Sequence, residues 1–340
     1  MKILILRPDH IGDMILTTPF IASLRNGLPE AKISILCGSW SVPVLKNNPY
    51  NIEIIKCNYP WLARSSDRSW KEFLSVILQL RKRKFDIIFN LRKALREAVW
   101  ARVIGAEKIY GFDISKSSWT NTHKVHYNGK IHIADLYLEL IRDMGIEPVH
   151  NGMELFFDQD EISEYEEKFK KNRPYVIIAP ATPDPNRLWL PERWAEIADW
   201  IIKDLKLPVF MIGTESDKPV INSVIANMKE KAENLSGKLP LRATALLIKE
   251  AEFVVSVNSA PVHIACAVKT PAAGLYGPNN PKHWGPYANG KANQSVSRIE
   301  TFKYANGAHN DSGGFELITT EDVKESIIKL CSEESINVNL

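Results

Sequence analysis

Short apolar runs alternate with longer amphipathic segments along the first half of the chain. The longer segments carry apolar residues at helical spacing and predict helices at 13–26, 69–84, 93–104 and 132–145. The short runs are rich in Ile, Leu and Val and predict strands at 2–7, 32–37, 52–56, 86–91 and 108–112. This alternation is typical of a parallel sheet covered by helices.

The same alternation resumes after residues 146–173, which contain Pro148, Gly152 and a run of charged residues and predict a linker with a connecting helix. Strands are then predicted at 175–179, 208–212, 252–257 and 272–276, and helices at 192–205, 217–231, 240–250, 260–268 and about 321–331. Residues 277–317 are rich in Gly, Pro and Asn and predict irregular structure.

This pattern predicts an α/β fold of two doubly wound, Rossmann-like domains, because 340 residues exceed one ordinary hydrophobic core. The predicted domains are residues 1–150 and residues 151–340, and the last helix is left open to pack back on the N-terminal domain. Ligands of such sheets bind where loops leave the carboxyl ends of the strands.

The amino-acid composition, the net charge and the length of the apolar runs restrict the class of protein further. Hydrophobic residues make up 45% and charged residues 24%, as in globular proteins, and a net charge of +3 does not favour nucleic-acid binding. The apolar runs are far shorter than the roughly 20 residues of a membrane span. Residues 1–6 are expected to form a strand rather than a signal peptide.

The cysteines and histidines predict neither disulfides nor a metal site. The 4 cysteines are scattered without a close pair, as in a reducing cytoplasm, and the 8 histidines form no metal-binding motif. The triplet Asp158-Gln159-Asp160 lies in the linker, away from any predicted strand end, and is interpreted as an acidic turn.

The loop after the first strand carries the first candidate for catalysis. It reads Arg7-Pro8-Asp9-His10-Ile11-Gly12-Asp13. Gly12 permits a tight turn or a close backbone approach to a ligand. Asp13 is either a general base that accepts a proton from a hydroxyl group, or the N-cap of the following helix.

Loops of the second half provide candidates for phosphate and ribose binding. Ser259 and Ala260 are predicted at a helix N-terminus suited to a diphosphate, with His263 one turn on; alternatively Ser259 is an ordinary N-cap and His263 a structural histidine. Glu215 and Asp217 either bind a ribose hydroxyl or cap a helix.

Two basic clusters lie in the first half. Arg92, Lys93 and Arg96 follow a predicted strand and either bind a phosphorylated ligand or are simply solvated. The cluster of residues 81–84 is interpreted as a solvated helix end, where cations complement the helix dipole.

Three motifs, in order, give the chain a resemblance to a known family. The first is Arg-x-x-x-Ile-Gly-Asp-x-Ile-Leu-x-Thr-Pro, starting at Arg7. The second is Ala181-Thr182 followed by Arg187-Leu188-Trp189 and Pro191-Glu192-Arg193-Trp194. The third runs from Val254 through Asn258-Ser259-Ala260-Pro261-Val262-His263 to Tyr287. Together they resemble glycosyltransferase family nine, the ADP-heptose:lipopolysaccharide heptosyltransferases.

The resemblance implies a GT-B fold and an inverting, metal-independent transferase without a cofactor. Asp13 would be the general base, and Thr182 and Arg187 would hold the donor phosphates, with Arg187 standing where the family usually has Lys. The implied partners are ADP-heptose and a phosphorylated glycolipid acceptor of a Gram-negative bacterium. The implied location is cytoplasmic, in peripheral contact with the inner face of the cytoplasmic membrane.

The sequence departs from the family pattern at two positions. Asn258 stands where the family usually has an acidic residue, and Ala260 where it has Gly. These departures leave open a transferase of another nucleotide sugar, a nucleotide-sugar epimerase and a non-catalytic sugar-nucleotide binder. The acceptor hydroxyl and the oligomeric state are not predicted.

Overall fold

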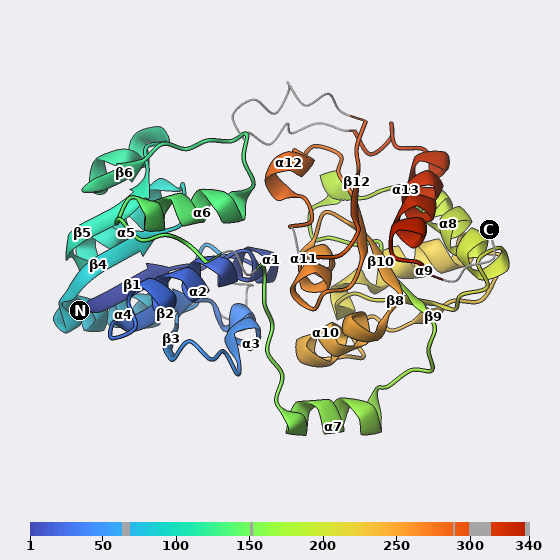
Figure 1. The fold of residues 1–340 in the computed structure, drawn as a ribbon, viewed down its shortest axis with the longest axis horizontal. Coiled ribbons are helices and arrows are strands. Elements are labelled where there is room, and N and C mark those ends of the chain that lie inside the picture. Colours follow the sequence, from blue (N-terminus) through green and yellow to red (C-terminus); the bar gives the residue numbers. More distant parts are fainter. Residues whose placement is uncertain (63–68, 150–151, 288–289, 299–313, 337–340) are drawn as a thin grey trace. The chain divides into compact units, whose positions relative to one another are not determined.

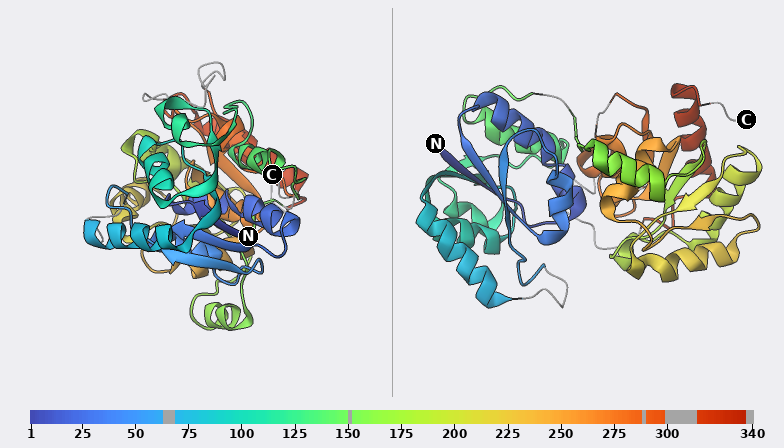
Figure 2. Two further views of the ribbon diagram at one scale, coloured as in Figure 1. Left: turned by 90° about the vertical axis from the view of Figure 1, so that its left-hand side faces the viewer. Right: turned by 90° about the horizontal axis from the view of Figure 1, so that it is seen from below.

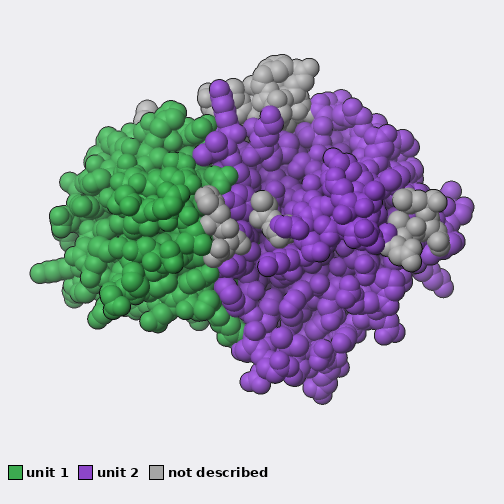
Figure 3. All heavy atoms as spheres, viewed as in Figure 1, with its two compact units in different colours: residues 1–128, 133–151 green, residues 129–132, 152–340 purple. Residues whose placement is uncertain are grey.

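A computed structural model describes residues 1–340 except 63–68, 150–151, 288–289, 299–313 and 337–340 (Figure 1). The chain divides into two compact units, coloured separately in Figure 3. The N-terminal unit comprises residues 1–128 and 133–151, and the C-terminal unit comprises residues 129–132 and 152–340.

The described part of the N-terminal unit contains one six-stranded parallel sheet with the strand order β3-β2-β1-β4-β5-β6. Its strands are β1 (Lys2–Leu6), β2 (Lys32–Cys37), β3 (Ile52–Lys56), β4 (Phe85–Asn90), β5 (Ala106–Phe112) and β6 (His123–Val125). Its α-helices are α1 (Ile11–Ile15), α2 (Thr18–Gly27), α3 (Val42–Leu45), α4 (Trp70–Arg83), α5 (Leu95–Ile104) and α6 (Ile133–Arg142). The described residues of this unit also form the 3₁₀ helices η1 (Ser39–Ser41) and η3 (Ser115–Thr120).

Successive side chains of the central strands pack against helices on opposite faces of the sheet. Leu4 and Leu6 of β1 are buried in one cluster with Phe73 and Ile77 of α4. On β4, Ile88 joins that cluster, whereas the next residue, Phe89, packs against Phe20 of α2 with ring centroids 5.0 Å apart. Because successive strand residues point to opposite faces, the two contacts place α4 and α2 on opposite sides of the sheet.

The described C-terminal unit repeats this topology, with the parallel strand order β12-β11-β10-β7-β8-β9. Its strands are β7 (Val176–Ala179), β8 (Val209–Met211), β9 (Glu233–Asn234), β10 (Phe253–Val257), β11 (Ala272–Leu275) and β12 (Asn293–Val296). Its helices are α7 (Gln159–Lys168), α8 (Pro191–Lys203), α9 (Lys218–Asn227), α10 (Leu241–Glu250), α11 (Ala260–Ala267), α12 (Pro281–Trp284) and α13 (Thr320–Glu333), with 3₁₀ turns η4 (Pro185–Arg187) and η5 (Glu215–Asp217).

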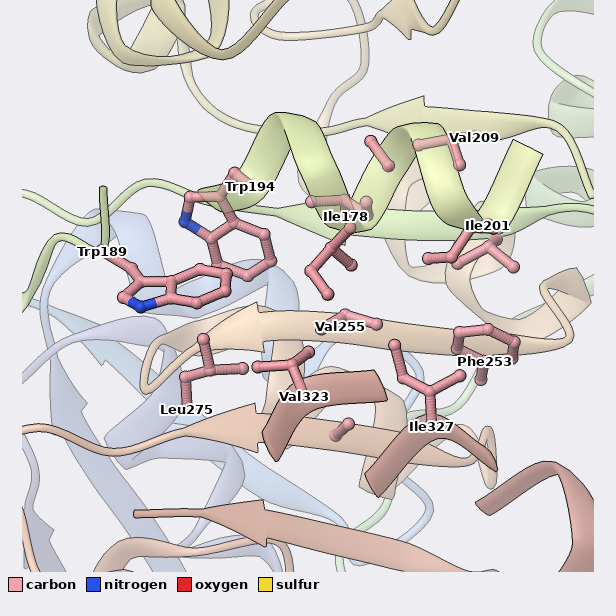
Figure 4. Packing of buried hydrophobic residues seen from close by; sticks show 14 of the residues in the cluster. Ile178, Trp189, Trp194, Ile201, Val209, Phe253, Val255, Leu275, Val323 and Ile327 are labelled. Atoms are coloured by element: carbon pink, nitrogen blue, oxygen red, sulfur yellow. The ribbon is translucent and has the colours of Figure 1, made fainter. Parts of the chain in front are cut away.

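Helix α13 belongs to the core of the C-terminal unit. Its residues Val323 and Ile327 are fully buried against the sheet, as Figure 4 shows, and the helix contacts α8, β11 and β12. A capping box of Thr319 and Asp322 fixes its start. The last helix therefore packs on its own unit, whereas the sequence left open a return to the N-terminal domain.

The structure confirms the predicted α/β class with two Rossmann-like units. It differs from the sequence predictions in several details, and the range 277–317, predicted to be irregular, contains helix α12 and strand β12. The predicted helix 13–26 is two helices, α1 and α2, separated at Leu16 and Thr17. Strands β6, β9 and β12 were not predicted because they are short, polar segments at or near sheet edges. Asp158 caps α7 through a capping box with Glu161 rather than forming a simple turn.

Candidate active site

The strand order of each unit creates one point at which neighbouring loops diverge. In the N-terminal unit this point lies between β1 and β4, and in the C-terminal unit between β7 and β10. The chain leaves β1 and β4 toward opposite ends of the strand order, and in doubly wound sheets ligands bind at the carboxyl ends of the strands at such a point. Most of the candidate residues lie in the loops at these two points, whereas Glu215 and Asp217 follow β8.

At the first point a buried guanidinium organises the loop after β1. Arg7, which is 2% exposed, pairs with Asp9 at 3.0 Å and with Asp13 at 2.9 Å. It also donates to the carbonyl of Leu91 after β4 at 3.2 Å and lies over the ring of Tyr137 in α6. Burial works to lower the pKa of Arg7, but the neighbouring tyrosine and carboxylates outweigh burial and raise that pKa above its ordinary value.

Asp13 is not an N-cap, because it lies in the first turn of α1 and the N-cap is His10. Its Oδ1 accepts a hydrogen bond from Arg7 Nη2, while Oδ2 has no such partner among the described residues. The side chain is 26% exposed. One carboxylate oxygen is therefore fixed by a cation, and the other is available to accept a proton.

Gly12 does not form the tight turn that the sequence allowed. It is a helical residue of α1, and its carbonyl accepts a hydrogen bond from the N–H of Leu16 at 2.9 Å. Only the second predicted role, a close backbone approach to a ligand, remains a prediction for Gly12.

The three predicted basic residues of the N-terminal unit differ in their surroundings. Arg92 pairs with Asp9 and lies 3.6 Å from Glu97. Arg96 is exposed, and its guanidinium lies 5.6 Å from the ring of Trp61, whose Nε1 donates to Glu97 at 3.0 Å. The charge of Arg92 is thus balanced internally, whereas Arg96 lies at the surface.

Lys93 is held by an aromatic residue. Its Nζ donates to the hydroxyl of Tyr127 at 2.7 Å. Burial lowers the pKa of Lys93 to about 8, with Arg7 acting in the same direction and Asp13 opposing it. This lysine therefore loses its charge in the range just above neutral pH.

At the second point, between β7 and β10, Arg187 reaches across to the neighbouring loop. Its Nε donates to Asp184 at 3.0 Å, and its Nη1 donates to the carbonyl of Asn258 at 3.5 Å. Thr182 is buried in the same loop as Arg187, and Asn258 is buried beside the start of α11. The hydrogen bond from Arg187 to Asn258 therefore joins two residues that lie 71 positions apart in the sequence.

Ser259 occupies the N-cap position of α11, but its side chain makes no capping hydrogen bond. Its hydroxyl instead lies 3.3 Å from the hydroxyl of Ser256. Ala260 begins the helix and His263, which is 5% exposed, lies within it. The first turn of α11 is thus not closed by a capping side chain, which suits an anionic ligand.

Glu215 and Asp217, after β8, have structural partners. Both the backbone N–H and the hydroxyl of Thr214 donate to Asp217 Oδ2 at 2.7 Å, completing a capping box. Glu215 pairs with Lys218 at 2.6 Å and is largely exposed. Capping therefore accounts for Asp217, and of the two only Glu215 keeps an exposed carboxylate.

Several residues of these sites received no role from the sequence, among them Arg7, Asp9, Glu97 and Asp184. Arg7 and Asp9 stand within the quoted first motif, and two charged residues directly after an apolar strand are a signal for a buried ion pair. No local pattern identifies Glu97 as a partner of Arg92 and Trp61, because that contact depends on how α5 packs.

Two doubly wound units, each with basic and polar side chains at the strand-order reversal, have the architecture of the GT-B class. The model of glycosyltransferase family 9 (heptosyltransferase) matches residues 73–308. The chain therefore belongs to this family and is a glycosyltransferase, which confirms the resemblance seen in the sequence.

Similar proteins agree with this assignment. The chain is 27% identical to lipopolysaccharide heptosyltransferase 3 of Escherichia coli K12, over 95% of this chain and 96% of that protein. A family 9 glycosyltransferase of Veillonella parvula superposes with a TM-score of 0.80 at 22% identity, covering 98% of this chain and 97% of the other. ADP-heptose LPS heptosyltransferase II of E. coli superposes with a TM-score of 0.76 at 21% identity, covering 98% and 100%.

Among the described residues, none of the helices combines the length and apolar character that crossing a membrane requires. In the same part of the chain, His, Cys, Asp and Glu side chains form no group of three or more that could hold a metal ion.

The Arg7 network predicts a stability effect. We expect Arg7→Met to lower the free energy of unfolding by about 3–5 kcal/mol, because it removes the buried cation that Asp9 and Asp13 share and leaves Asp9 with Arg92 as its remaining described cation. Arg7→Lys should cost less, since it keeps the charge but not the forked geometry. Urea denaturation of the three proteins measures the difference, and a loss below about 0.5 kcal/mol for Arg7→Met would contradict this role.

Proposed function

We propose that the protein transfers heptose from ADP-heptose to an inner-core lipopolysaccharide acceptor, with inversion and without a metal ion. The names of the similar E. coli proteins, a lipopolysaccharide heptosyltransferase and an ADP-heptose LPS heptosyltransferase, support the donor and the acceptor class. The proposal places the enzyme in the cytoplasm, in peripheral contact with the inner membrane that holds the acceptor.

The geometry of Asp13 carries the mechanistic part of the proposal. Arg7 holds one carboxylate oxygen, and the other is open to accept a proton. As the acceptor oxygen forms its bond to the anomeric carbon, Asp13 takes up the hydroxyl proton. The bond from that carbon to the diphosphate breaks on the opposite side, so the configuration inverts and ADP leaves.

The charge that develops on the leaving diphosphate needs cations and N–H donors. Arg187, which Asp184 orients toward the Asn258 carbonyl, supplies a fixed cation. Ser259, Ala260 and the uncapped first turn of α11 supply hydroxyl and N–H donors. Thr182 and His263 complete the proposed phosphate site.

We assign the proposed contacts with the ribose and with the acceptor from the exposure and the charge of the side chains. Glu215 is the better candidate for the ribose, because Asp217 is engaged in its capping box. Lys93 and Arg96 are proposed to bind phosphates of the acceptor, and Gly12 to allow its close approach. Arg92, which is balanced by Asp9 and Glu97, is proposed to position this loop beside the acceptor.

Substitution of the proposed base tests the mechanism. Asp13→Asn should lower kcat by about 10²–10⁴-fold, because the amide retains the shape of the side chain but accepts no proton. Calorimetry should find donor affinity within about twofold of wild type, since Asp13 is not a donor ligand here. Transfer at the wild-type rate by a folded Asp13→Asn protein would refute the assignment.

Lys93 predicts a pH dependence of acceptor binding. Its charge is present below pH 8 and is lost as the pH rises through about 8, so the KM for a phosphorylated acceptor should increase up to about tenfold between pH 7 and pH 9. The arginine of Lys93→Arg keeps its charge over this range, so the KM of this variant should not change between pH 7 and pH 9. A profile that is the same in both proteins would remove Lys93 from acceptor binding.

Metal independence is tested by chelation. The transfer rate should stay within about twofold after treatment with EDTA, because Arg187 and the first turn of α11 provide the charge stabilisation. Arg187→Met should weaken donor binding by at least about tenfold with or without EDTA. A rate that requires an added divalent cation would contradict this part of the proposal.

A further inference from the structure

Helix α4 carries apolar residues on two faces. Phe73, Ile77 and Leu80 are buried against the sheet. Trp70, Leu74 and Leu78 are 57%, 43% and 57% exposed. These three residues recur every fourth position and therefore form one continuous stripe along the helix. Figure 2 shows α4, in light blue, on the outside of the N-terminal unit.

Basic residues are interleaved with this stripe. At about 100° per residue, Lys71, Arg81 and Lys82 fall within the same third of the helix circumference as Trp70, Leu74 and Leu78. Glu72, the acidic residue of α4, lies outside this sector. We call the six residues the α4 face. It combines an exposed apolar stripe with positive charge and contains no carboxylate.

We propose that the α4 face docks on an anionic lipid bilayer. A helix that lies in a membrane interface has this composition: apolar side chains enter the boundary of the acyl chains, while Lys and Arg contact anionic head groups. Trp70 has an amphipathic ring of the kind that favours the interface between lipid and water. An acidic protein partner would satisfy the cations as well, but it would not require a continuous exposed apolar stripe between them.

The α4 face is continuous with the proposed acceptor residues. The ring centroids of Trp70 and Trp61 lie 5.7 Å apart. Trp61 in turn donates to Glu97 and lies under the guanidinium of Arg96. Helix α4 therefore begins beside the residues assigned to the acceptor phosphates. A bilayer that contacts this face would hold a glycolipid head group near them, so the inference rests on the proposed function.

Vesicle binding tests the inference with the full-length protein. Wild type should bind vesicles of phosphatidylethanolamine and phosphatidylglycerol at least about tenfold more tightly than phosphatidylcholine vesicles, and high salt should weaken this binding. Leu74→Glu/Leu78→Glu should lower it by at least about tenfold. The control Leu317→Glu/Ile328→Glu, which adds the same charge at exposed apolar positions of the C-terminal unit, should change it by less than about twofold.

Two results would overturn the inference. One is equal vesicle binding by wild type and Leu74→Glu/Leu78→Glu. The other is a change of oligomeric mass in light scattering without a change in vesicle binding, which would make the α4 face a protein contact.

A transfer assay with the acceptor sugar stripped of its acyl chains separates this inference from the proposed function. Wild type and Leu74→Glu/Leu78→Glu should transfer at equal rates to this acceptor. If neither transfers while vesicle binding depends on the α4 face, the proposed activity fails and the docking surface stands. If both transfer but wild type binds no vesicles, the docking surface fails and the activity stands.

Discussion

The parallel arrangement of every described strand decides where chemistry is located in this protein. All loops that follow the strands of one sheet leave at the same edge, and the order reverses once in each unit, at β1/β4 and at β7/β10. Helix starts and loop side chains from segments distant in the sequence therefore meet at these two points. The two units share this topology but carry different side chains, so one unit presents a loop with the Asp13 carboxylate and the other a loop with Arg187 beside the start of α11.

The buried side chain of Arg7 fixes the conformation of the loop at the first of these points, between β1 and β4. Removing a guanidinium from water is costly, and two carboxylates, a carbonyl and an aromatic ring offset that cost. The same contacts join the loop after β1 to the chain after β4 and to α6. Asp13 is thus held by groups that also hold the unit together, which is how a short helix such as α1 can present a carboxylate in a defined position.

Much of this arrangement was predictable from the sequence, and the rest depends on tertiary contacts. The runs of Ile, Leu and Val located the central strands because buried parallel strands are apolar on both faces. Strand β9 carries only Glu233 and Asn234 and has no such signal. Asp13 was identified from its loop, but its pairing with Arg7 was not, and the capping role of Asp217 became clear only from its bonds to Thr214. Spacing alone does not show which acidic side chain caps and which remains exposed.

Calorimetric titration with ADP-heptose and with UDP- and GDP-linked sugars, with and without EDTA, tests whether the loops after β7 and β10 bind the diphosphate of ADP-heptose through Arg187 and the start of α11. ADP-heptose should bind most tightly of the three, equally well with EDTA, and Arg187→Met should remove most of this affinity. Tighter binding of a UDP- or GDP-sugar would contradict the donor assignment and direct attention to Asn258, and binding that requires a divalent cation would contradict the proposed phosphate site.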